Sequence, residues 1–120
     1  MKRKTVLLVD DDKIYVDIIA DILVERGFLV LKAYNGFDAF QTIEKIEVDL
    51  ILLDIVMPEF DGLEFCKVTK KMTPSTAVLI VSGQESDSEI KMAQKCGVDE
   101  FITKPYEINF LVERIQHYLK

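Results

Sequence analysis

The sequence contains few of the residues that mark specialised classes of protein. Its 120 residues include no tryptophan, one histidine, two cysteines, three prolines and five glycines. The chain shows no internal repeat, no low-complexity segment and no linker at which it would divide into domains. Cys66 and Cys96 lie in two separate predicted helices and follow neither a zinc-ligand nor a CxxC spacing. We therefore expect two reduced, partly buried thiols, and no disulfide or redox pair.

Basic residues and long apolar runs are also scarce. Lysine and arginine number 15 against 21 aspartates and glutamates, which gives a formal net charge of -6. Such a chain lacks the basic stripe that neutralises phosphates, so we do not expect nucleic acid as a direct partner, and the short basic segment at residues 2–4 does not alter this. No apolar run approaches the roughly 20 residues of a membrane span, and no signal peptide opens the chain. We expect a cytoplasmic protein without membrane contact.

The residues that are present fit one globular domain over residues 1–120. Hydrophobic residues make up 49% of the chain and charged residues 30%, which suits a single core and leaves no room for a second domain. Five apolar runs predict strands, at Thr5–Val9, Phe28–Ala33, Leu50–Leu53, Ala77–Val81 and Glu100–Thr103. Most of them are almost continuously apolar, as strands covered on both faces should be.

Between these runs the sequence predicts five helices. Apolar stripes at helical spacing mark the first, the second and the last, while the third (about 62–72) and the fourth (about 87–95) have weaker stripes. The stripes consist of Tyr15, Ile18, Ile19, Ile22 and Leu23; of Phe37, Phe40, Ile43 and Ile46; and of Ile108, Leu111, Val112, Ile115 and Leu119. Gly27 and Gly97 follow the first and fourth helices, where glycine commonly ends a helix.

Strands that alternate with helices predict an α/β fold with right-handed crossovers and helices on both faces of the sheet. We expect a doubly wound, flavodoxin-like sheet of five parallel strands in the order 2-1-3-4-5. A site in such a sheet lies outside the carboxyl ends of the first and third strands, where the strand order reverses.

Polar residues stand at this predicted edge. Asp10 and Asp11 follow the first strand, Asp54 follows the third, and Ser82 and Lys104 follow the fourth and fifth. Each has a plainer interpretation: Asp11 or Asp12 as a helix cap, Asp54 as a solvated strand end, Ser82 as part of a turn, and Lys104 as a surface charge. Taken together, however, three carboxylates, a hydroxyl and an ammonium at the ends of four strands indicate a functional site.

The chemistry of these groups suggests phosphoryl transfer. Carboxylates a few Å apart repel by roughly 4 kcal/mol per pair at an effective dielectric constant near 20, and a bound cation reverses that repulsion. Oxygen ligands favour Mg²⁺, which takes one or two carboxylates and completes its shell with water and phosphate oxygens. Asp54 would then accept the phosphoryl group, and Lys104 and Ser82 would neutralise its oxygens. Replacing Asp10 or Asp11 by Asn is expected to stabilise the metal-free protein.

Four motifs in order, VLLVDDD, LILLDIVMPEFDG, LIVSG and FITKP, resemble the receiver domain of two-component response regulators, the CheY-like superfamily. The resemblance covers essentially the whole chain. It implies that Asp54 is the phosphoacceptor, that Asp11 binds Mg²⁺ directly and Asp10 mainly through water, and that the Val56 carbonyl is a third protein ligand. It gives Asp12 no role.

The resemblance also implies a conformational switch. Ser82 would turn toward the phosphoryl group, Phe101 would follow as the aromatic switch residue, and the face formed by the fourth helix, the fifth strand and the fifth helix would change shape. Lys104 takes the place of the family's lysine, and the bond to Pro105 is expected to be cis. Gly62 closes the Met-Pro-x-x-Asp-Gly turn of the family.

The function implied is a signalling module and not a conventional enzyme. A sensor histidine kinase or histidine phosphotransfer protein would supply the phosphoryl group, and the output would be a protein target or a phosphorylation-dependent homodimer. One hypothesis is a stand-alone receiver; the other is the N-terminal receiver of a longer transcription factor or enzyme, since the segment from Val98 to Ile115, including Arg114, resembles receivers of winged-helix regulators. Ile90 and Phe110 stand where those receivers commonly carry a charged pair.

Three further expectations concern single residues. A phosphatase of the DxD type is disfavoured because Val56, and not a second acid, stands two places after Asp54. His117 is expected to be a solvated side chain, since no four-helix phosphotransfer scaffold surrounds it. Val56 and Gln84 are expected to set the lifetime of the phosphoryl group, because Val56 can only crowd an attacking water that Gln84 could hold.

Overall fold

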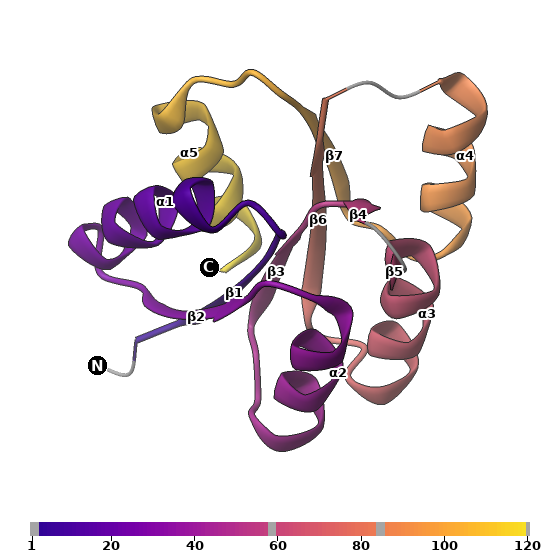
Figure 1. Ribbon diagram of the computed structural model, residues 1–120, viewed down its shortest axis with the longest axis horizontal. Helices are drawn as coiled ribbons and strands as arrows, with labels where there is room; N and C mark the ends of the chain where they lie inside the picture. Colours follow the sequence, from indigo (N-terminus) through magenta and orange to yellow (C-terminus); the bar gives the residue numbers. More distant parts are fainter. Residues whose placement is uncertain (1–2, 58–59, 84–85, 120) are drawn as a thin grey trace.

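The chain folds around one five-stranded parallel sheet. The computed structural model describes residues 3–57, 60–83 and 86–119. The sheet has the order β2-β1-β3-β6-β7, with every neighbouring pair parallel (Figure 1). Its strands are β1 (Thr5–Val9), β2 (Leu29–Ala33), β3 (Leu50–Leu53), β6 (Ala77–Ser82) and β7 (Glu100–Thr103). Because β4 and β5 lie outside this sheet, the order is the 2-1-3-4-5 expected from the sequence, and the doubly wound fold is confirmed.

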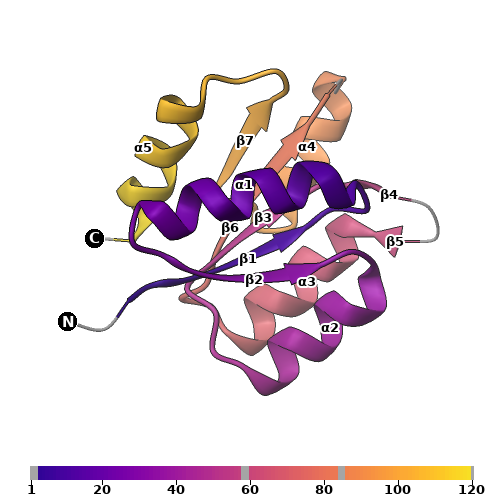
Figure 2. The ribbon, with the colours of Figure 1, turned by 60° about the vertical axis from the view of Figure 1, so that its left-hand side comes forward.

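Five helices cover the two faces of the sheet. They are α1 (Lys13–Glu25), α2 (Gly36–Lys45), α3 (Gly62–Met72), α4 (Asp87–Lys95) and α5 (Ile108–Tyr118). Helices α1 and α5 lie on one face, and α2, α3 and α4 lie on the other, so the sheet is the middle of three layers (Figures 1 and 2). Because both faces are covered, the strands had to be apolar at successive positions, which is the pattern seen in the sequence.

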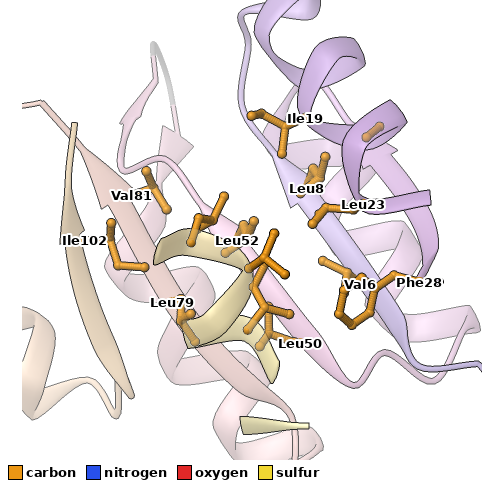
Figure 3. Close-up of a cluster of buried hydrophobic side chains, with 14 of the residues drawn as sticks. Val6, Leu8, Ile19, Leu23, Phe28, Leu50, Leu52, Leu79, Val81 and Ile102 are labelled. Atoms are coloured by element: carbon orange, nitrogen blue, oxygen red, sulfur yellow. The ribbon is translucent and has the colours of Figure 1, made fainter. Parts of the chain in front are cut away.

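Alternate strand residues feed two separate hydrophobic clusters. Val6 and Leu8 of β1 point into the cluster beneath α1 and α5, shown in Figure 3, whereas Leu7 and Val9 point into the cluster beneath α2, α3 and α4. All four side chains are buried. Phe65 of α3 is the largest fully buried side chain among the described residues, and its ring packs against Phe40 and Phe60. Each face of the sheet is therefore covered by a cluster of closely packed apolar side chains.

The helix stripes expected from the sequence are partly wrong. Ile18, Phe37 and Ile46 are exposed, at 55%, 70% and 45% of their surface. In α1 the buried residues are Val16, Ile19, Ala20 and Leu23, and in α2 they are Ala39 and Ile43. Part of each contact face is formed by an alanine, Ala20 in α1 and Ala39 in α2, which the expected stripes of larger apolar residues did not include. The stripe of α5 is confirmed at Leu111, Val112 and Ile115.

A short antiparallel hairpin, β4 (Val56–Met57) with β5 (Phe60–Asp61), was not expected from the sequence. It begins two residues after Asp54 and leads into α3, whose first turn is capped by the Asp61 carboxylate through bonds from the backbone N–H groups of Leu63 and Glu64. Gly62 is the first residue of α3, and glycine is favoured there because a Cβ would come 2.9 Å from the Ile55 side chain and 3.2 Å from the Ile55 Cα. The hairpin thus holds the chain after Asp54 close against the helix.

The two cysteines are reduced, as expected. Cys66 is buried in α3, and Cys96 caps the end of α4 and is partly buried. The Cys66 thiol donates to the Cys96 carbonyl oxygen at 3.4 Å, and burial raises its pKa to about 11. A thiol with this pKa is poorly ionised and inert near neutral pH.

Over the described residues, no helix combines the length and apolar character needed to cross a membrane.

Neighbouring isoleucines of α1 provide a test of the layer arrangement. Ile19 is 6% exposed in the cluster under α1, whereas Ile18 is 55% exposed. We expect Ile19→Ala to lower the free energy of unfolding by about 2–5 kcal/mol because it leaves a cavity, and Ile18→Ala to change it by less than about 0.5 kcal/mol. Urea unfolding of both variants measures the difference. Equal losses would contradict the orientation of α1.

Candidate functional site

The three acids expected to converge do so. Asp10, Asp11 and Asp54 each offer a carboxylate oxygen, and these atoms lie within 4.8 Å of one another at the carboxyl ends of β1 and β3. The direct pairing of β1 with β3, with Val9 opposite Leu53, brings the two strand ends together. Asp10 is buried, Asp54 is partly buried and Asp11 is exposed. The cluster therefore has a buried floor and an open mouth.

Lys104 lies against two of these acids. Its Nζ is 3.2 Å from an Asp10 carboxylate oxygen and 3.9 Å from an Asp54 oxygen. The lysine arrives from the end of β7, where its backbone N–H donates to the Ser82 carbonyl oxygen at 2.8 Å. The Lys104–Pro105 peptide bond is cis, which confirms the expectation from the sequence. One ammonium against three carboxylates leaves the site with a net negative charge.

Three consecutive aspartates have different surroundings. The question of which acid caps α1 is settled in favour of Asp12, whose carboxylate accepts the backbone N–H of Tyr15 at 3.1 Å. Asp11 is therefore free to face the site. Asp10 accepts the backbone N–H of Asp12 at 3.0 Å in addition to its ion pair with Lys104. Because these two contacts compensate the Asp10 charge, Asp10→Asn is not expected to stabilise the protein, contrary to the expectation from the sequence.

Asp54 is an acid whose charge is disfavoured by burial. Burial raises the pKa of its carboxyl, and the nearby Asp10 carboxylate adds to the rise, while the backbone N–H of Val56, donating at 2.8 Å, and Lys104 oppose it. Desolvation is the largest of these causes. The Asp54 carboxylate is thus held at higher free energy than a solvated one, a condition that a positively charged ligand relieves.

Ser82 occupies the last position of β6, opposite Thr103 of β7. Its side chain is 1% exposed, and its hydroxyl has no hydrogen-bond partner among the described residues. A buried hydroxyl without a partner costs free energy, so it is poised to bond a group that enters the site. Gln84, expected to influence the fate of that group, lies outside the described residues.

The expected switch and output residues differ in burial. Phe101 is partly buried in β7, where it packs against the cluster beneath α2, α3 and α4. Ile90 of α4 is partly buried, and Phe110 of α5 is 46% exposed. Nearby, Arg114 of α5 donates from Nε to both carboxylate oxygens of Glu100, at 2.7 and 2.9 Å, which holds the pKa of that carboxyl below its usual range.

Two tyrosines beside the site were missed by the sequence reasoning. The Tyr15 ring lies under Lys104, whose Nζ is 4.2 Å from the ring centroid, and the Tyr15 hydroxyl is hydrogen-bonded to that of Tyr106. Tyr15 appeared in the sequence only as a member of an apolar stripe. His117, in contrast, is exposed and stacks edge-on against Tyr118, as expected for a solvated side chain.

The donor set fits a hard cation. All three acidic side chains present oxygen, the atom type preferred by Mg²⁺ and Ca²⁺, and no cysteine or histidine lies in the cluster. The unfavourable burial of the Asp54 charge is a second reason why a cation would bind here. Val56, whose side chain is 67% exposed, lies beside the mouth of this cluster.

Comparison with known proteins gives one consistent result. The sequence model of the response regulator receiver domain matches residues 6–116. A receiver domain protein (CheY-like) from Methanospirillum hungatei is 30% identical, with a TM-score of 0.95 over 98% of this chain and 94% of the other. The receiver domain of a Francisella response regulator is 31% identical, with a TM-score of 0.87 over 97% and 96%. A two-component response regulator from Clostridium difficile is 26% identical, with a TM-score of 0.92 over 98% and 96%.

The raised pKa of Asp54 predicts a pH-dependent stability. Because the folded state raises this pKa, the contribution of Asp54 to stability is complete below its ordinary pKa and is lost as the pH rises through the folded value. In chelator, Asp54→Asn should therefore be more stable than the wild type at neutral pH, and the difference should disappear toward acidic pH. Urea unfolding across the pH range measures it.

A variant Asp54→Asn that is less stable than the wild type at neutral pH would contradict the unfavourable burial of this charge.

Proposed function

Because this chain belongs to the response regulator receiver domain family, we propose that it is a phosphorylation-controlled switch of two-component signalling in which Asp54 accepts the phosphoryl group. The observation that carries the proposal is the cluster of Asp10, Asp11 and Asp54 within 4.8 Å, with Lys104 beside it. An acceptor carboxylate next to an ammonium and a pair of cation-binding acids would supply the positioning and the positive charge on which phosphoryl transfer depends.

The transfer step assigns a role to each group. An Asp54 carboxylate oxygen attacks the donor phosphorus, the bond from phosphorus to the leaving group breaks, and the leaving group departs with the electron pair. The backbone N–H of Val56 donates to one Asp54 oxygen, so the other Asp54 oxygen is the one that attacks. Lys104 moves from its carboxylates toward the incoming phosphoryl oxygens, and the Ser82 hydroxyl, which has no partner among the described residues, donates to another of them.

Mg²⁺ is the cofactor that we propose for the acidic cluster. Asp11 at the open mouth, the Asp54 carboxylate and the Val56 carbonyl would hold the ion, with Asp10 acting mainly through water. When bound, the ion supplies positive charge to the transferring phosphoryl oxygens. The bound ion would also offset the repulsion among the three carboxylates, which the single ammonium of Lys104 does not balance.

The phosphoryl donor would be a sensor histidine kinase or a histidine phosphotransfer protein. The site already contains the acceptor, the ammonium and the cation-binding acids, so the donor needs to supply only the phosphoryl group and its leaving group. We therefore assign no conventional turnover to this protein: each phosphorylation is a single event that is reversed by hydrolysis of the acyl phosphate. The output would be a protein partner or a second copy of the phosphorylated chain.

Transmission of the signal would start at Ser82 and continue to Phe101. Ser82 ends β6 and Phe101 lies in the adjacent β7, in register with Ile80. When the Ser82 hydroxyl turns toward the phosphoryl group, the partly buried Phe101 ring can move into the space released, which changes the face formed by α4, β7 and α5. A bistable ring of this kind needs only a few kcal/mol of bias, within the range of two charge-assisted hydrogen bonds.

Phosphorylation by a small donor tests the acceptor. Acetyl phosphate with Mg²⁺ should add one phosphoryl group to the wild type and none to Asp54→Asn, because the acceptor carboxylate is lost. Asp11→Ala or an excess of chelator should slow the reaction strongly. Asp12→Asn is the matched control, since it removes a neighbouring charge and keeps the helix cap. Intact-mass spectrometry resolves the products, and full phosphorylation of Asp54→Asn would refute the assignment.

The lifetime of the phosphoryl group should depend on Val56. Its side chain is 67% exposed beside Asp54 and has no polar atom with which to orient a hydrolytic water. Val56→Asn should therefore shorten the half-life by severalfold, and Gln84→Ala should lengthen it. Decay of the phosphorylated mass after removal of the donor gives both rates. An unchanged or slower decay in Val56→Asn would show that apolar crowding does not control hydrolysis.

The output face should include Ile90 and Phe110. Phe110 is 46% exposed on α5, and Ile90 is partly buried on α4, so both can contact a partner. Phosphorylation-dependent self-association or partner binding should weaken by at least tenfold in Ile90→Lys and Phe110→Glu. Phe37→Glu, which changes an exposed phenylalanine on α2, is the control. Sedimentation velocity of phosphorylated and unphosphorylated samples detects self-association, and equal effects of all three changes would argue against this face.

A further inference from the structure

The ammonium of Lys104 has a third partner besides its two carboxylates. Its Nζ lies 4.2 Å from the centroid of the Tyr15 ring, well within the range of about 6 Å at which a cation is attracted to an aromatic face. Tyr15 is in the first turn of α1, and Lys104 follows β7, so the contact joins two distant parts of the chain. The Tyr15 ring and the Asp10 carboxylate therefore limit the positions that the Lys104 ammonium can occupy.

The Tyr15 ring is itself held in place. Its hydroxyl is hydrogen-bonded to the hydroxyl of Tyr106, two residues after Lys104, across a separation of 91 residues in the sequence. Both tyrosines are partly buried, and burial is the main cause that raises the pKa of each phenol. Both phenols therefore stay neutral near neutral pH, and the bond between them persists. The pair fastens the segment after β7 to the start of α1.

Tyr15 also reaches the floor of the site. It lines a cavity of about 20 Å³ together with Asp10 and Asp54. That volume is sufficient for about one water molecule. An apolar side chain could fill the space beside α1 equally well, but it would offer no negative aromatic face to the ammonium and no hydroxyl to Tyr106.

We propose that Tyr15 is a positioning residue for Lys104: its ring holds the ammonium above Asp10 and Asp54, and Tyr106 fixes the orientation of the ring. This inference rests on the proposed function of the site. Lys104 has a flexible four-carbon stem, so without the ring its ammonium would sample more positions and would meet the incoming phosphoryl group less often. The ring remains a partner when the ammonium leaves Asp10 for phosphoryl oxygens.

Three variants separate the ring from the hydroxyl. Tyr15→Leu removes the aromatic face, Tyr15→Phe keeps the face and removes the bond to Tyr106, and Tyr106→Phe removes the same bond from the other side. With acetyl phosphate at saturating Mg²⁺, we expect phosphorylation to slow by about fivefold to tenfold in Tyr15→Leu, which lies within the range of a cation–π contact expressed as a rate. The two phenylalanine variants should slow by less than about threefold, since the ring is retained.

A double-mutant cycle with Lys104→Ala distinguishes positioning from packing. If Tyr15 acts through Lys104, then Tyr15→Leu should not slow phosphorylation further in the Lys104→Ala background. The same cycle in urea unfolding with chelator, which requires no phosphorylation, should show the two substitutions to be non-additive. Additive effects in both cycles, or a wild-type rate in Tyr15→Leu, would overturn the proposal. Tyr15→Phe as slow as Tyr15→Leu would assign the effect to the hydroxyl and overturn the role of the ring.

Failure of the proposed function has a different signature. If the wild type takes up no phosphoryl group on Asp54, the assignment of the site is wrong, and the unfolding cycle alone decides whether Tyr15 holds Lys104. If the wild type is phosphorylated and the Tyr15 variants are phosphorylated at the wild-type rate, the site assignment stands and the inference about Tyr15 is wrong.

Discussion

The parallel pairing of β1 with β3 is the constraint on which the site depends. Parallel strands end at the same edge of a sheet, so a chain that places acids after both strands must bring their charges together. Here the pairing of Val9 with Leu53 leaves Asp10, Asp11 and Asp54 with oxygens within 4.8 Å. The hydrophobic burial of β1 and β3 on both faces holds these charges in place against their repulsion. The free energy of the core thus maintains an electrostatically strained site.

Most of the architecture could be predicted from the sequence because it follows from burial on two faces. The strands β1, β3 and β7 have the predicted bounds, and β2 and β6 differ by one residue. Continuously apolar runs leave little freedom in where such strands begin and end. The hairpin of β4 with β5 could not be predicted in this way, since strands of two residues carry no periodic signal.

Side-chain orientation was harder to predict than secondary structure. The stripe expected on α1 contained Ile18, which is exposed, because a sequence pattern favours large apolar residues over the alanine and valine that contact the sheet. The convergence of the acids and Lys104 could be inferred from topology. The contact of Tyr15 with Lys104 and Tyr106 could not, since it depends on where a loop returns to a helix 91 residues earlier.

The shallow attachment of α4 has a consequence for where the protein deforms most easily. Within α4, every residue of which the structure describes, Ala93 is the only buried side chain. The Ala93 methyl group contributes only about 0.8 kcal/mol of hydrophobic stabilisation, and Ile90 is only partly buried, so displacing this helix costs less than displacing α1, which buries four side chains. The fold is therefore mechanically uneven. Among the five helices α4 has the fewest buried side chains, so local opening is expected to cost least free energy there.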